Sequence, residues 1–145
     1  MSTIDNFFAI DAATGLIKRE LGQSALTSTG YVGTQWDQGD AASTDLACII
    51  NIESCKVSAG DERYTFRLVG SNASNRSDAQ VLDTLEVGDA GTLSIETVDT
   101  TAGDQFVMRG RSFRRGLDFQ YIDLHLEVAG TSPSIGFGAY ISKEF

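Results

Sequence analysis

The feature that most constrains the fold is an alternation of apolar and polar residues with a period of two. It is clearest in QYIDLHLEV, where Ile122, Leu124, Leu126 and Val128 alternate with polar side chains. A β-strand sends successive side chains to opposite faces, so such a run predicts a strand with one buried face. The same alternation occurs in DLACIINIE, RYTFRLVG, GTLSIETV, DQFVMRG and SIGFGAYI. A further segment, AQVLDTLEVGD, fits either a strand or a short helical turn.

Turn signals separate these runs. The connecting segments are SAGDE, GSNASNRSD, VGDAGT, TTAGD and AGTSPS, and the chain has 15 Gly but only 1 Pro. Short strands at this spacing predict an all-β fold, an antiparallel β-sandwich or barrel. With 145 residues the chain is most simply one domain, whose sandwich we place in residues 45–145.

Residues 1–44 differ from the rest of the chain. They are rich in Ser, Thr, Gly and Asp, with an apolar patch at Phe7 and Phe8 and one short alternation around Tyr31 and Val32. We interpret them as an extended N-terminal arm followed by an edge strand. Such an arm either folds over its own sandwich or reaches a neighbour. The alternative, a first strand with a loose lead-in, stays open.

The net charge argues against two classes of partner, and the cysteines indicate the redox state of the chain. The net charge of -9 and the pI of about 4.4 argue against nucleic acid and against anionic membrane surfaces as partners. The first residues lack the basic and apolar regions of a secretory signal, so we expect synthesis in the cytoplasm. Cys48 and Cys55 are therefore expected to be free thiols, and their spacing matches no zinc motif. We expect no metal and no cofactor.

The search for catalytic residues finds one candidate cluster. Asp123, the sole histidine His125, and Glu127 share one face of a predicted strand. Imidazole and carboxylates at that spacing suit proton transfer or a metal, but they are also typical of the solvent face of a strand. We expect the protein not to be an enzyme, and a small hydrolase that uses this face remains the alternative.

The segment RGRSFRRG concentrates positive charge in an acidic chain. Arg109, Arg111, Arg114 and Arg115 are four of the 11 basic residues, and Phe113 lies between them. Arginine pairs with carboxylates in a bidentate manner, and arginine and aromatic residues are enriched at interface hot spots. The segment therefore predicts an anchor on an acidic partner surface. The alternative is a loop whose arginines pair with the protein's own acids.

The order of these features resembles the capsid cement, or decoration, proteins of tailed bacteriophages that have a jelly-roll fold. The stretches that carry the resemblance are ALTSTGYVGTQWDQGD, DLACIINIE, RGRSFRRGLDFQYIDLHLEVAGTSPSIG and FGAYI, which span most of the chain after residue 24. The first two dozen residues look longer than is usual in that family, and the late block is richer in arginine.

The resemblance implies a jelly-roll fold and a non-enzymatic protein on the exterior of the virion capsid. Its partners would be the major capsid protein and further copies of itself, as a dimer or trimer. The residues that we expect to bind partners are Arg109, Arg111, Phe113, Arg114, Arg115, Phe7, Phe8 and Trp36. The alternative is a lectin-like glycan-binding module, in which Trp36, Tyr31 or Tyr121 would stack on a sugar.

Overall fold

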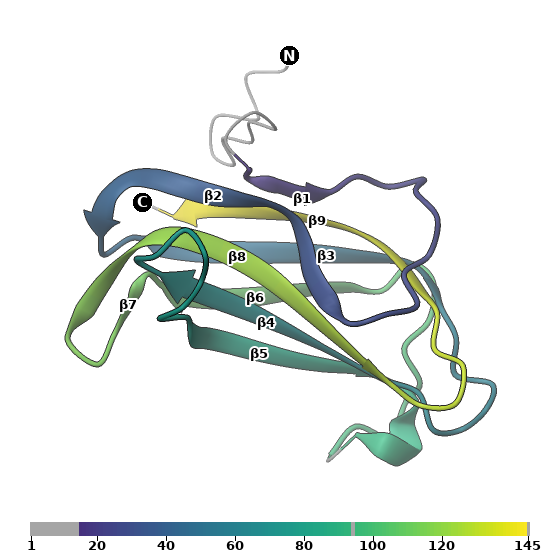
Figure 1. Cartoon of the computed structure of the whole chain (residues 1–145). Coiled ribbons are helices and arrows are strands. Elements are labelled where there is room, and N and C mark those ends of the chain that lie inside the picture. The colour runs from purple at the N-terminus through teal and green to yellow at the C-terminus, as the bar shows by residue number, and fades with distance from the viewer. Residues whose placement is uncertain (1–14, 94, 145) are drawn as a thin grey trace.

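The computed structural model, which describes residues 15–93 and 95–144, consists of two antiparallel β-sheets packed face to face (Figure 1). One sheet has the strand order β1-β9-β3-β6. The other has the order β2-β8-β4-β5, and β7 pairs with β8. The strands are β1 Ile17–Arg19, β2 Gly30–Ala42, β3 Asp45–Cys55, β4 Arg63–Ser71, β5 Gln80–Gly88, β6 Gln105–Arg111, β7 Phe113–Arg114, β8 Leu117–Ala129 and β9 Ile135–Glu144. The predicted all-β antiparallel sandwich is confirmed.

The alternating apolar residues form the core between the sheets. Ile122, Leu124 and Leu126 of β8 are fully buried, as the period of two predicts. Phe66 of β4 and Phe137 of β9 meet edge to face across the two sheets, with 4.9 Å between ring centroids. Burying a side chain of this size stabilises a fold by roughly 1.5–3 kcal/mol. The core therefore supplies the stability, and the sheets hold their edges and end loops in fixed positions.

The described part of the predicted arm-and-strand region, residues 15–44, contributes one strand to each sheet. β1 and β2 are edge strands, one in each sheet. Val32 and Trp36 of β2 are buried in the core. Residues 15–42 thus contribute to the sandwich. Phe7 and Phe8 lie outside the described residues, so the predicted arm stays a prediction.

One predicted strand is wrong. In the segment GTLSIETV, Gly91 and Thr92 end a short 3-10 helix, η3 (Ala90–Thr92), and residues 95–98 form no strand; Ile95 is 90% exposed. The loop is closed at its base, where Gly88 N donates to Thr100 Oγ1 (2.9 Å) and Thr100 N donates to the Gly88 carbonyl (3.0 Å). These bonds turn the chain away from the sheet, so the alternation in this segment has no partner strand. The ambiguous segment before it is a strand, β5.

Both cysteines are free, as predicted. Cys48 faces the core, and burial raises its pKa to about 12. Cys55 is half-buried, and burial raises its pKa to about 11. Both side chains are therefore thiols at neutral pH, and Cys48 packs as a small apolar residue.

Candidate interaction site

The segment RGRSFRRG ends in a tight β-hairpin, which we call the arginine hairpin (residues 113–118). Phe113 pairs with Asp118, and Arg114 with Leu117. Between them Arg115 and Gly116 have φ values of 53° and 81°. Two successive residues with positive φ are typical of the type I′ turn, which matches the twist of two antiparallel strands.

The base of the arginine hairpin is anchored by Ser112, which is fully buried. Its hydroxyl accepts a hydrogen bond from Thr44 N (2.7 Å) and donates one to the carbonyl of Ala42. Its backbone joins the same network, because Phe119 N donates to the Ser112 carbonyl (3.0 Å). The hairpin thus projects from a fixed point between β2, β3 and β8.

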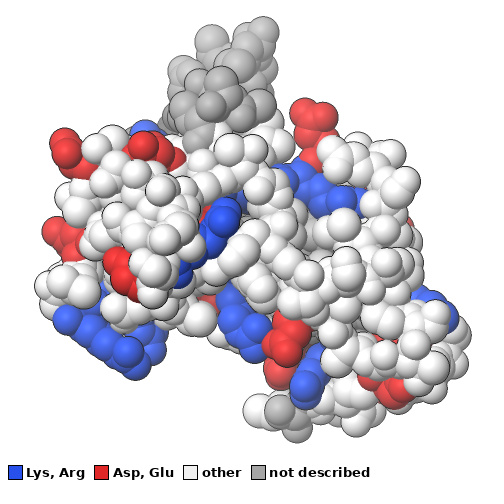
Figure 2. Space-filling view, in the orientation of Figure 1, with Lys and Arg blue, Asp and Glu red and all other residues white. Residues whose placement is uncertain are grey.

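The structure separates the four arginines of the segment. Arg111 pairs with Asp45 at 2.7 Å, and this contact holds the pKa of the Asp45 carboxyl below its usual range. Arg109 lies on β6 opposite Ala47 of β3. Arg114 and Arg115 are exposed in the hairpin. One of the blue patches in Figure 2, at the lower left, lies over the β7 hairpin.

Apolar side chains accompany these charges. Phe113 is 47% exposed and Leu117 is 49% exposed. Directly paired residues of antiparallel strands point to the same face, so Arg114 and Leu117 share one face while Phe113 lies on the other. The hairpin therefore offers apolar contact area next to positive charge, which is the combination found in interface hot spots.

The face predicted to carry catalysis, with Asp123, His125 and Glu127, holds its charged groups in ion pairs. Asp123 is 1% exposed and accepts two hydrogen bonds from the guanidinium of Arg76, at 2.9 and 3.0 Å, and one from Gln35 Nε2 at 3.0 Å. All of these contacts neutralise or satisfy the carboxylate. Asp123 is thus the buried acidic member of an ion pair with Arg76, and this pair belongs to the fold.

The two neighbouring residues of that face do not join Asp123 in an acid–base arrangement. Glu127 pairs with Arg67 at 2.8 Å. The ring of His125 meets the ring of Tyr31 edge to face, at 4.9 Å, and burial followed by the Arg67 charge lowers the pKa of His125. The histidine is therefore mostly neutral at pH 7, and the carboxylate beside it is already paired with arginine.

The aromatic residues named for glycan stacking are not open platforms. Trp36 is 5% exposed, so its ring is unavailable to a sugar or to a partner protein. Tyr31 is 41% exposed, but the Arg76 guanidinium lies 4.1 Å from the centroid of its ring. Tyr121 is half-buried on β8, paired with Asp37 of β2.

The structure also contains a buried lysine, Lys18, that was not predicted from the sequence. Lys18 is 3% exposed, and its ammonium donates to the carbonyls of Thr34 (2.7 Å) and Ile122 (3.1 Å). Thr34 lies where the pairing of β2 with β8 shifts register. Burial lowers the pKa of Lys18 to about 8. A sequence signal for it exists, because Lys18 follows the apolar Leu16 by two positions and so shares its face.

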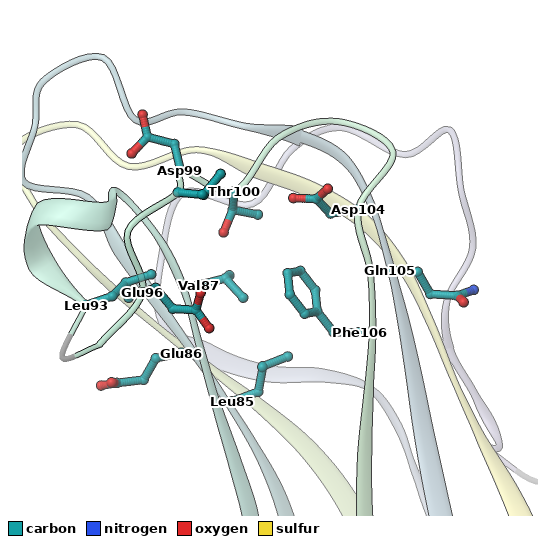
Figure 3. A pocket seen from close by; sticks show the side chains of 11 residues that line it. Leu85, Glu86, Val87, Leu93, Glu96, Asp99, Thr100, Asp104, Gln105 and Phe106 are labelled. Carbon is teal, nitrogen blue, oxygen red and sulfur yellow. The ribbon is translucent and has the colours of Figure 1, made fainter.

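A second feature lies at the opposite end of β6, and we call it the acid-rimmed pocket (Figure 3). Its volume is about 270 Å³, and it is lined by residues of β5, of β6 and of the segment between η3 and β6. In Figure 3 the side chains of Leu85, Val87 and Phe106 gather around the cavity. The carboxylates in its lining are Glu86, Glu96, Asp99 and Asp104. The loop mistaken for a strand thus forms one wall of the pocket.

Comparisons with known proteins add no relative. The sequence matches no protein-family model and no curated protein at a significant level.

Within residues 15–93 and 95–144, no group of three His, Cys, Asp or Glu side chains is placed to hold a metal ion. No helix in that part of the chain is long and apolar enough to cross a membrane.

Proposed function

We propose that the protein is a structural virion protein, which binds the outside of an icosahedral phage head and cements neighbouring major capsid subunits. The observation that carries the proposal is the arginine hairpin. It is a tight turn with exposed Phe113, Leu117, Arg114 and Arg115, and buried Ser112 anchors it to an acidic body. No contact within the described chain explains why this turn carries arginine.

The fold supports the same role. Leaving out the short β7, each sheet interleaves early and late strands, in the orders 1-9-3-6 and 2-8-4-5. This arrangement supports the jelly-roll assignment that the sequence resemblance implies. A small sandwich that binds only the assembled shell stabilises that shell by mass action, without any catalytic chemistry.

The chemistry of the hairpin suits a capsid partner that presents carboxylates. Guanidinium groups pair with carboxylates through two parallel hydrogen bonds, and the flanking apolar side chains exclude water from such pairs. An exposed pair contributes roughly 0–1 kcal/mol, whereas removing one partner of a desolvated pair costs several kcal/mol. Binding therefore depends on arginines that folding does not need.

The position of the coding gene is the simplest test, because a gene for a cement protein is expected beside a major capsid gene. The decisive test is co-sedimentation of the protein with expanded empty heads. The variant F113A/R114A/R115A should bind the heads much more weakly than the native protein. Its melting temperature should change little, because all three side chains are exposed.

A matched control removes the same positive charge elsewhere. The variant K56A/R67A lacks two basic side chains outside the hairpin and should bind heads as the native protein does. Full head binding by F113A/R114A/R115A would refute the hairpin as an anchor. A collapse of its melting temperature would assign the hairpin to the fold instead.

A further inference from the structure

The two sheets of the sandwich differ in their outer faces. The outer face of the sheet β2-β8-β4-β5 carries ion pairs, such as Arg67 with Glu127 at 2.8 Å. On the outer face of the sheet β1-β9-β3-β6, strand pairing aligns one apolar or aromatic side chain from each strand. These four residues, which we call the apolar row, are Ile17, Tyr140, Ile49 and Val107.

The apolar row points away from the core. Ile49 lies between Cys48 and Ile50, which both belong to the core, and successive side chains of a strand alternate between its faces. The same alternation turns Tyr140 and Val107 outward, because their neighbours along the strand pack in the core. Val107 is 46% exposed, so this end of the row is open to solvent. Aligned apolar side chains on an outer face are typical of a surface that binds another molecule.

A hollow of about 250 Å³ lies at the other end of the row, and we call it the outer hollow. Its lining includes Ile17 and Tyr140 of the row, and also Leu21, which is 57% exposed. Gly138 leaves the space that Leu21 occupies, because a Cβ atom at Gly138 would lie 2.8 Å from Leu21 Cδ2. The row therefore has an exposed valine at one end and an apolar hollow at the other.

The strand order makes this face complementary to itself. Val107 lies on β6 and the outer hollow lies at β9 and β1, on opposite sides of β3. When two copies pack with these outer faces together, a two-fold axis that runs along β3 exchanges the two sides. Val107 of each copy then lies over the outer hollow of the other. Self-complementarity of this kind is what an isologous dimer requires.

The size and charge of the face also suit a second copy. The strands β1, β9, β3 and β6 have 3, 10, 11 and 7 residues. At about 3.4 Å per residue and about 4.8 Å between strands, they cover roughly 500 Å² per copy. Two copies thus bury about 1,000 Å², the lower limit for a specific interface, so we expect a dimer that dissociates on dilution. Copies with a net charge of -9 repel one another, and a row of uncharged side chains lets them meet with the least repulsion.

We propose that the outer face of the sheet β1-β9-β3-β6 is the interface of a two-fold dimer, in which Val107 of each copy enters the outer hollow of the other. The inference goes beyond the proposed function and does not depend on the arginine hairpin. Two-fold symmetry covers both faces at once, so association stops at two copies. On a head, such a dimer would carry two arginine hairpins and could contact two capsid subunits.

A pair of charge variants provides the test. V107E brings a carboxylate to the outer hollow, and L21K places an ammonium group in its wall. Each variant alone should be monomeric in sedimentation velocity runs at about 100 μM, where the native protein should dimerise. In an equal mixture, one of the two symmetric contacts pairs the introduced charges and the other keeps the native valine and leucine. The mixture should therefore form a 1:1 heterodimer, which also shows that both variants are folded.

A matched control carries the same substitution on the other sheet. Val81 of β5 is 37% exposed, and V81E should dimerise as the native protein does. Raising the ionic strength to about 1 M, where the Debye length is about 3 Å, gives a second control. It should leave the apolar native dimer intact and weaken the heterodimer of V107E with L21K, because that heterodimer contains an ion pair.

Three results would overturn the inference: a native protein that stays monomeric, a V107E variant that dimerises like the native protein, or a mixture without heterodimers. The full-length variant F7S/F8S identifies one other occupant of the face. If the native protein is monomeric and F7S/F8S dimerises, the chain's own N-terminal segment is the occupant and the dimer is refuted.

Head binding separates this failure from that of the proposed function. If V107E dimerises like the native protein and F113A/R114A/R115A loses head binding, the dimer interface falls and the cementing proposal stands. If F113A/R114A/R115A binds heads fully while V107E is monomeric and is rescued by L21K, the capsid anchor falls and the dimer interface stands.

Discussion

Arg76 and Arg115 make an instructive comparison, because both are arginines in a left-handed backbone conformation. They are the non-glycine residues with positive φ in the described part of the chain, at 63° and 53°. A residue with a side chain in this region stores roughly 1–3 kcal/mol of strain. Arg76 offsets that cost through its two hydrogen bonds to buried Asp123 and its contact with Tyr31. Arg115 is exposed, and its positive φ is the one that the type I′ turn of the hairpin requires.

This difference separates charged residues that stabilise the fold from charged residues that do not. A guanidinium that neutralises a buried carboxylate holds the fold, and its removal leaves an uncompensated charge. A guanidinium on an exposed turn contributes little to stability. The guanidinium of Arg76 is thus explained by a contact inside the protein, whereas the turn at Arg115 needs a positive φ but not a guanidinium.

The largest expected effect is the loss of Arg76. Asparagine accepts the left-handed conformation, so R76N removes the ion pair without adding backbone strain. Among the described residues, Asp123 then keeps the side-chain amide of Gln35 as a hydrogen-bond donor in its buried site. We expect the free energy of unfolding to fall by about 3 kcal/mol in urea denaturation. A loss below about 1 kcal/mol would show that the pair contributes little.

The next effect concerns the anchor of the hairpin. S112A removes a buried hydroxyl and leaves Thr44 N and the Ala42 carbonyl without that partner. An unsatisfied buried polar group costs roughly 1–3 kcal/mol, so we expect a loss of about 2 kcal/mol. Hydrogen exchange should show faster exchange at Thr44. Unchanged exchange at that amide would contradict the role of Ser112.

Lys18 gives a smaller effect that depends on pH. Its folded pKa of about 8 lies below the ordinary value of 10.5, so between these values the unfolded chain binds more protons. The contribution of Lys18 to stability therefore rises with pH above about 8. The difference in unfolding free energy between native protein and K18M should move toward the native protein by up to about 1 kcal/mol from pH 8 to pH 9. A flat difference across that window would mean that the folded pKa is not lowered.

The smallest effect on stability is expected at Arg115. Asparagine followed by glycine is the preferred pair in a type I′ turn, so R115N should be neutral or stabilise the fold by up to about 1 kcal/mol. The same variant should weaken binding to heads, because a guanidinium is lost from the hairpin. Thermal melting and co-sedimentation check the two parts separately. A clear loss of stability would reveal a contact of Arg115 within the protomer.

Much of the fold could be predicted because the apolar alternation is local. The strands around Cys48, Phe66, Leu124 and Phe137 each carry their own pattern of burial, and all four face the core. The segment around Ile95 has the same alternation but no strand to pair with, since the Gly88–Thr100 bonds close it as a loop. Pairing between distant segments decides such cases, and a local pattern does not contain it.

In the candidate interaction site, too, local features could be predicted from the sequence and long-range contacts could not. The concentration of arginine around Phe113 was visible in the sequence, but the pairing of Arg111 with Asp45, 66 positions away, was not. The buried contacts of Lys18 and Asp123 also join segments that are distant in the sequence. The sequence reveals where charged residues are concentrated. Only the structure reveals which of them are already paired or buried within the protein.

The central claim is that the exposed arginines of the hairpin serve association, whereas Arg76, which pairs with the buried Asp123, serves the fold. The most direct test measures unfolding free energy and head binding for the matched variants R76N and R114A/R115A. We expect R76N to lose about 3 kcal/mol and, while folded, to bind heads normally. R114A/R115A should keep its stability within about 1 kcal/mol and lose head binding. Normal head binding by R114A/R115A, at unchanged stability, would contradict the account.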